Sequence, residues 1–100
     1  MNFEELIKNV ERWAYDKKLL PGSPEKQTLK LMEEAGELAG ALLRGDRKKS
    51  VDGIGDCFVV LIILSRQLGF LPEICLQTAW DEIKDRTGKT VNGTFIKDIR

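Results

Sequence analysis

Three glutamates crowd one short segment of the chain, KLMEEAGELAGALL at residues 30–43. At the helical spacing of about 100° per residue, Glu33, Glu34 and Glu37 fall within one arc of about 100°. Lys30 lies on the same arc, whereas the opposite arc carries leucine, methionine and alanine. The segment therefore reads as an amphipathic helix with an acidic polar side. Taken alone, a solvated surface and a chemical site explain this pattern about equally well.

A second acidic pair, Asp52 and Asp56, lies one helical turn apart in the segment that follows. The dipole of a helix that starts near residue 48 would stabilise Asp52. Asp56 lies further in, where the surface turns into core and an unpaired carboxylate is costly. We therefore expect Asp56 to face a ligand or a partner. The next positions along this face are all apolar: Val59, Val60 and Ile63.

The short connection GDRKKS makes the two acidic segments an antiparallel pair, with Glu34 and Glu37 near Asp52 and Asp56. Two carboxylates about 5 Å apart at an effective dielectric of about 20 repel by roughly 3 kcal/mol. Either protonation or a divalent cation would relieve this repulsion. Because the chain has no histidine and only two cysteines, the ligands would be oxygens. Such ligands suit magnesium, manganese or calcium, and this number of them favours magnesium, with manganese as a substitute.

Hydrophobic periodicity and capping residues predict an all-α fold of about four helices in a single domain, residues 1–100. The segment VVLIIL at residues 59–64 is also compatible with a buried strand, but the long periodic stretch around it favours a helix. The predicted helices run from the cap Asn2 to Leu20, from Ser23-Pro24 to about Arg44, from Lys48 to Leu68, and from Pro72 to about Asp85.

The third predicted helix is apolar on all sides between Cys57 and Leu64. Such a helix must be covered all round, and three short helices of one chain offer too little surface to do so. We therefore expect a small helical bundle that is completed by homodimerisation.

The C-terminal tail contains Asn92-Gly93 between two short β-prone stretches, which predicts a tight turn or a small hairpin. Lys84 and Arg86 lie just before this tail. Cations at a helix end commonly compensate the helix dipole, but glycine-containing loops also carry binding groups. Lys84, Arg86 and Asn92, together with Lys30, are therefore candidate phosphate ligands.

Composition narrows the class of partner. The chain has 16 basic and 16 acidic residues, so it lacks the basic excess that is typical of proteins that bind nucleic-acid polymers. Its longest apolar run, Cys57–Leu64, is far shorter than the roughly 20 residues that span a bilayer. No signal-peptide pattern precedes it, and Cys57 and Cys75 are predicted to be buried thiols. We expect a cytoplasmic protein without a membrane partner.

These residues resemble the MazG-type, all-α NTP pyrophosphohydrolase superfamily, whose signature is Glu-x-x-Glu, a variable spacer, and Glu-x-x-Asp. Glu34 and Glu37 match the first half, and Asp56 matches the final aspartate. The closing segment IKDRTGKTVNGTFIKD is similar to that of the short, often phage-associated MazG-like proteins. The resemblance extends from about Trp13 to Asp98.

The resemblance implies magnesium-dependent hydrolysis of a nucleoside triphosphate to the monophosphate and pyrophosphate, by a homodimer or a dimer of dimers. The metal ligands would be Glu34, Glu37, Asp52 and Asp56. Glu33 or Glu34 would orient the attacking water or accept its proton. Lys84, Arg86 and Asn92 would hold phosphate oxygens.

The chain departs from the superfamily signature at Gly53, where a glutamate is expected. Asp52 can supply the missing carboxylate, but its direction on the helix differs by about 100°. Two other functions therefore stay open. One is a non-catalytic helical oligomerisation or nucleotide-binding module that has lost a metal ligand. The other is a metal-independent interaction protein whose acids are only solvated.

Overall fold

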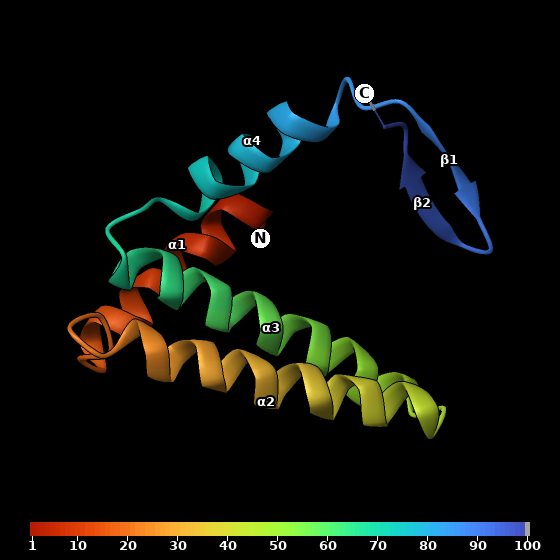
Figure 1. Ribbon diagram of the computed structural model, residues 1–100. Coiled ribbons are helices and arrows are strands. Elements are labelled where there is room, and N and C mark those ends of the chain that lie inside the picture. Colours follow the sequence, from red (N-terminus) through yellow and green to blue (C-terminus); the bar gives the residue numbers. More distant parts are fainter. Residues whose placement is uncertain (100) are drawn as a thin grey trace.

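The fold is all-α with a short C-terminal hairpin, as predicted (Figure 1). The computed structural model describes residues 1–99 of the chain. The segment 59–64 is helical and not a strand. The elements are α1 Phe3–Asp16, α2 Pro24–Leu43, α3 Arg47–Gln67, α4 Pro72–Ile83, β1 Gly88–Val91 and β2 Thr94–Lys97.

Side-chain caps define the starts of the first three helices. Asn2 Oδ1 accepts a hydrogen bond from the Glu5 amide at 2.8 Å, and Ser23 Oγ accepts one from the Lys26 amide at 3.2 Å. Asp46 caps α3 in the same way. Such a cap typically contributes about 1 kcal/mol to stability, so the predicted starts follow from local chemistry.

Two helix ends lie earlier than predicted. Helix α1 stops at Asp16 and not near Leu20, because Lys18 adopts a left-handed conformation with φ 60°. Lysine is an uncommon residue for that conformation, so the sequence contains no clear signal for the end of the helix at this point. Helix α4 ends at Ile83 and not at Asp85, because the backbone turns there toward the hairpin.

Helices α2 and α3 lie side by side and antiparallel along most of their length (Figure 1). Gly53 of α3 is buried against α2. A Cβ atom at this position would lie 3.2 Å from the Leu38 Cβ and 3.3 Å from its Cα. The glycine thus sets how closely the two helices approach. A side chain at residue 53 would have to push Leu38 aside by a few tenths of an ångström, so glycine suits the close approach of the two helices at the position where the superfamily signature has a glutamate.

A pair of alanine variants tests the role of Gly53. Gly53→Ala should be less stable than Gly55→Ala by about 1–3 kcal/mol, because its methyl group overpacks the contact with Leu38. A Cβ atom at Gly55 would have no neighbouring atom within 4 Å, so alanine there should stabilise the helix by up to about 1 kcal/mol. Urea unfolding of both variants measures the difference, and equal stabilities would contradict this packing argument.

Helix α1 covers one end of α3. The rings of Phe3 and Phe58 meet edge to face with centroids 5.7 Å apart. Glu11 pairs with Arg66 at 3.4 Å. The Gln67 side chain donates to the Leu19 carbonyl at 3.0 Å and so ties the loop after α1 to the end of α3.

The hairpin extends away from the helices (Figure 1). Its strands pair antiparallel, with Gly88 opposite Lys97 and Val91 opposite Thr94. Asn92 and Gly93 form the turn with φ values of 51° and 80°, the geometry that Asn-Gly favours. The predicted turn is therefore confirmed as a hairpin, and every residue of both strands is exposed.

The single chain is open. Its buried apolar residues are few, and none of them is aromatic: Ile7, Ala14, Ala41, Val60, Ile62 and Ile63. The radius of gyration is 16.0 Å, whereas a compact domain of this length has about 13 Å. The prediction of buried thiols was wrong for this single chain, because Cys75 is exposed and Cys57 only half-buried.

Within residues 1–99, no single helix is both long and apolar enough to cross a membrane. Helices α3 and α4 reach the required length and hydropathy only when combined, and they are bent by 102° relative to each other.

Candidate active site

A groove of about 660 Å³ lies between α2 and α3. Its walls carry four acids, two cations and several residues with little or no side chain. Both helices contribute to it, so the groove exists only because the two acidic segments pair. It is lined by Glu33, Gly36, Glu37, Gly40, Ala41, Arg44, Lys49, Asp52, Gly53 and Asp56.

Asp56 is the acid whose environment is most perturbed. Its side chain is half-buried on α3, and this desolvation raises the pKa of the carboxyl above its ordinary value of 3.8. The charges of Asp52 and Glu34 raise the pKa further, whereas the nearby Lys30 ammonium lowers it. The structure thus confirms that Asp56 lies at the boundary between surface and core, among other carboxylates.

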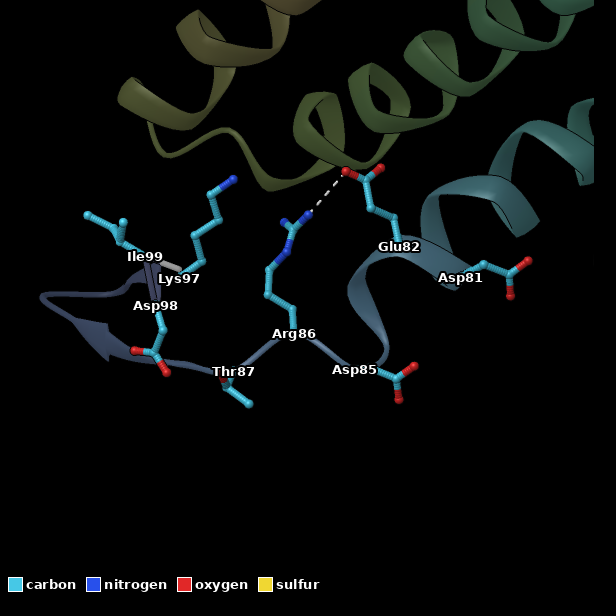
Figure 2. Close-up of a pocket in the computed structure, with 8 residues that line it drawn as sticks. All are labelled: Asp81, Glu82, Asp85, Arg86, Thr87, Lys97, Asp98 and Ile99. Atoms are coloured by element: carbon cyan, nitrogen blue, oxygen red, sulfur yellow. Dashed lines mark hydrogen bonds and ion pairs between the residues drawn. The ribbon is translucent and has the colours of Figure 1, made fainter.

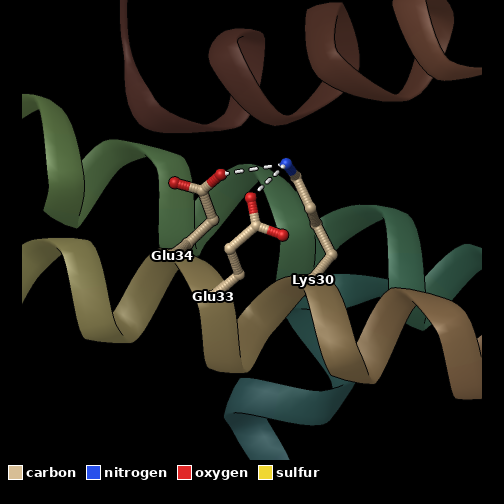
Figure 3. A network of polar contacts seen from close by, with 3 residues as sticks. All are labelled: Lys30, Glu33 and Glu34. Carbon is tan, nitrogen blue, oxygen red and sulfur yellow. Dashed lines mark hydrogen bonds and ion pairs between the residues drawn. The ribbon is translucent and has the colours of Figure 1, made fainter.

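Lys30, Glu33 and Glu34 form a small ionic network on α2 (Figure 3). The Lys30 ammonium lies 3.3 Å from a Glu33 oxygen and 3.4 Å from a Glu34 oxygen. These hydrogen bonds raise the pKa of Lys30, and the bond to Glu33 has the larger effect. The Glu34 side chain is only 12% exposed, whereas that of Glu33 is 58% exposed. Glu34 is thus the inward-facing member of the pair.

The donor chemistry of the groove fits a hard divalent cation, because all of its acidic ligands are carboxylates. Desolvation, and after it the charges of Asp52 and Glu34, raise the pKa of Asp56, so a cation beside this carboxylate would be favourable. Within residues 1–99, however, no three acidic or cysteine side chains are close enough together to hold a metal ion as they stand. The groove therefore has carboxylates of a suitable kind but, within residues 1–99, no preformed set of three ligands.

The structure brings together most of the predicted acidic residues. Glu33, Glu37, Asp52 and Asp56 line one groove, and Glu34 is close enough to Asp56 to influence its pKa. Asp52 shares this groove although it lies one residue before the expected glutamate position. The pairing of α2 and α3 places it there.

The predicted cations of the tail do not line this groove. Lys84 pairs with Asp81 at 3.4 Å, and Asn92 lies in the hairpin turn. Arg86 reaches back to Glu82 at 3.3 Å, inside a second hollow of about 590 Å³ between the end of α4 and the hairpin (Figure 2). In one chain these residues are therefore separate from the acidic groove.

Two cations of the groove were missed by the sequence analysis. Arg44 is the C-terminal cap of α2, and Lys49 lies in the first turn of α3. In the sequence both belong to the basic run RGDRKK, which looks like an ordinary solvated connection. The fact that the run joins two acidic helices is the signal that could have identified them.

The family of phosphoribosyl-ATP pyrophosphohydrolases matches residues 2–87, which include all four helices and every acid of the groove. The chain belongs to this family. The phosphoribosyl-ATP pyrophosphohydrolases are part of the MazG-like all-α NTP pyrophosphohydrolase superfamily, so the resemblance noted in the sequence is confirmed at that level. Their reaction class is the hydrolysis of an acid anhydride. The match ends before β1, so the hairpin lies outside it.

The chain is also similar to an uncharacterized 18.2 kDa protein from the rep-hol intergenic region of Haemophilus phage HP1 (strain HP1c1). The two are 48% identical over 67 residues, which are 66% of this chain and 41% of the phage protein. The chain therefore spans less than half of that relative. No solved structure matches the chain.

Proposed function

We propose that the protein is a magnesium-dependent nucleoside triphosphate pyrophosphohydrolase that converts an NTP or dNTP to the monophosphate and pyrophosphate. The observation that carries the proposal is the groove in which carboxylates of α2 and α3 converge, in a chain of a pyrophosphohydrolase family. The similarity to a phage protein supports a phage-type member of the superfamily.

The cation would be held by Glu34, Glu37, Asp52 and Asp56, of which Asp52 and Glu34 raise the pKa of Asp56 by their charge. Magnesium is the expected ion, and manganese is the substitute. When bound, a divalent cation neutralises phosphate charge and makes water more acidic. Asp52 is the ligand that would replace the signature glutamate, at whose position this chain has Gly53.

A carboxylate of α2 would act on the attacking water. The water oxygen forms a bond to phosphorus, the phosphoanhydride bond breaks, and pyrophosphate leaves with the electron pair of that bond. The proton of the water passes to Glu33 or Glu34. Lys30, which bridges both carboxylates at 3.3 and 3.4 Å, would hold them in place or contact a phosphate.

We further propose that the active species is a homodimer or a dimer of dimers. The chain exposes 8107 Å², whereas a folded monomer of 11.3 kDa exposes roughly 5,700 Å². The excess of about 2,400 Å² exceeds the roughly 800 Å² that each partner buries in a standard interface. A second copy would cover the half-exposed apolar face of α3 formed by Ile54, Phe58 and Leu61.

A second copy would also give the proposed phosphate ligands of the tail a groove to act on. Lys84, Arg86 and Asn92 do not line the groove of their own chain. In the substrate-binding role proposed for them, they would therefore act on the groove of another subunit.

The substrate is proposed only as a class of compound, the nucleoside triphosphates and deoxynucleoside triphosphates. Phosphoribosyl-ATP is a second candidate, because the family that matches the chain is described by that compound. We propose the cytoplasm as the compartment, in line with the two free cysteines, and neither a nucleic-acid polymer nor a membrane as a partner. A non-catalytic nucleotide-binding module is the alternative function, since Gly53 replaces a signature glutamate.

Pyrophosphate release from a panel of NTPs, dNTPs and phosphoribosyl-ATP tests the function. We expect turnover with magnesium and none after chelation with EDTA. Glu37→Gln should lower the rate at least about 100-fold, because loss of even an indirect support of a metal site costs 10–100-fold. Glu73→Gln, an exposed position in the first turn of α4, should keep the normal rate. Nucleotide binding without turnover would favour the non-catalytic module.

A further inference from the structure

Arg44 lies along the helix that it caps and not out in solvent. A Cβ atom at Gly40 would lie 3.1 Å from Arg44 Nη1, so the guanidinium occupies the space that a side chain at residue 40 would take. Gly40 thus opens a place for Arg44 on the wall of the groove. The backbone amide of Arg44 donates to the Gly40 carbonyl, so this cap does not depend on its side chain.

Lys49 faces the same groove from the first turn of α3. Neither its ammonium nor the Arg44 guanidinium lies within 4.0 Å of a carboxylate in the described part of the chain. Lys30, Lys84 and Arg86 all have such a partner. The groove therefore contains two cations whose charge is not already neutralised by an ion pair, although four acids line the same walls.

Both unpaired cations lie at the same end of the groove, where Asp52, three residues after Lys49 in α3, is also present. Arg44 and Lys49 flank the connection between the helices, and Glu33 and Asp56 lie at the opposite end because α2 and α3 are antiparallel. Arg44 is about 16 Å from Glu33 along the helix axis at 1.5 Å per residue. A ligand that spans the groove meets only carboxylates at the end formed by Glu33 and Asp56, and meets both unpaired cations together with Asp52 at the other end.

We propose that Arg44 and Lys49 form a subsite for the pyrophosphate portion of the substrate, which rests on the proposed pyrophosphohydrolase function. The pyrophosphate portion carries most of the negative charge of a triphosphate and gains more as the anhydride bond breaks. The guanidinium binds phosphate oxygens in a two-pronged geometry, and the ammonium acts as a point charge. The acidic end of the groove would hold the divalent metal ion, next to the phosphoanhydride bond that breaks.

Binding of inorganic pyrophosphate, measured by calorimetry in the presence of magnesium, tests the subsite directly. Arg44→Gln and Lys49→Gln should each raise the Kd for pyrophosphate about 10-fold or more, the loss expected for a charge-assisted hydrogen bond. Both should also raise the KM for the triphosphate. Arg47→Gln and Lys48→Gln remove the same charges from the same connection but lie outside the groove, and they should change neither constant more than about two-fold.

Gly40→Ala is an independent variant that keeps both cations. Its methyl group would lie 3.1 Å from Arg44 Nη1 and shift the guanidinium by a few tenths of an ångström, so pyrophosphate should bind more weakly than to the parent protein but more tightly than to Arg44→Gln. Gly55→Ala is the control, since no atom lies within 4 Å of its Cβ position.

The outcomes separate the subsite from the function. Weaker pyrophosphate binding in Arg44→Gln without turnover by the parent protein would support the subsite and overturn the hydrolase. Turnover by the parent protein with equal constants for Arg44→Gln and Arg47→Gln would overturn the subsite and leave the hydrolase standing.

Discussion

Asp56→Asn should reduce turnover at least about 100-fold, the scale expected when a ligand of a metal site is lost. Asparagine keeps the size of the side chain but removes the charge that the cation would neutralise. Because α3 is held by caps and apolar contacts and not by Asp56, the helical content should be unchanged by circular dichroism. A rate near that of the parent protein would refute the assignment of the groove as the active site.

The same variant has a second expected effect, on stability. The pKa of Asp56 is raised in the folded protein above its ordinary 3.8, so the folded state binds a proton more tightly than the unfolded state. Ionisation of Asp56 therefore lowers the free energy of unfolding as pH rises through the window above 3.8. Asp56→Asn lacks this penalty and should melt at a higher temperature than the parent protein at pH 7.

Thermal melts at several pH values measure this advantage, which should vanish below about pH 3.8, where Asp56 is protonated in both states. Magnesium supplies the control. It should raise the melting temperature of the parent protein, since an ion that binds only the folded state stabilises it, and it should leave Asp56→Asn unchanged. A lower melting temperature for the variant at pH 7 would show that Asp56 is a structural anchor.

Leu61→Asp should dissociate the proposed oligomer. Leu61 is 45% exposed in the single chain, on the same face of α3 as Ile54 and Phe58. An unpaired charge buried between two copies costs several kcal/mol, so sedimentation should show a shift to monomer at concentrations where the parent protein associates. Because the monomer has so small a core, the variant should also unfold at a lower temperature.

Asn9→Asp is a suitable control for Leu61→Asp. Asn9 is an exposed polar residue of α1, and the substitution adds the same charge. It should leave both association and melting temperature close to those of the parent protein. A parent protein that sediments as a monomer at all concentrations would contradict the proposed oligomer itself.

Local signals determined the four helices and the hairpin. Asn2, Ser23 and Asp46 satisfy the free amides at helix starts, and Asn92-Gly93 is one of the few pairs that accept a tight hairpin turn. These interactions act within a few residues of the chain. The end of α1 was mispredicted for the same reason, because the conformation of Lys18 has no strong local signal.

The acidic half of the site also followed from the sequence, since helical spacing fixes which carboxylates share a face. Glu37 and Asp56 line the same groove because a short connection leaves α2 and α3 little choice but to pair. What depends on tertiary packing is the fit between the helices. Only the structure shows that Gly53 lies closely against Leu38.

The cationic end of the groove was likewise decided by packing. In the sequence, Arg44 and Lys49 are two of several basic residues in one connection. Which of them faces the groove depends on the rotation of α2 against α3 and on the space left by Gly40. The sequence by itself thus determined the helices and their charged faces, because those depend on neighbours along the chain. The tertiary structure alone decided which basic residues meet those acids, because that depends on distances between segments that the chain brings together only on folding.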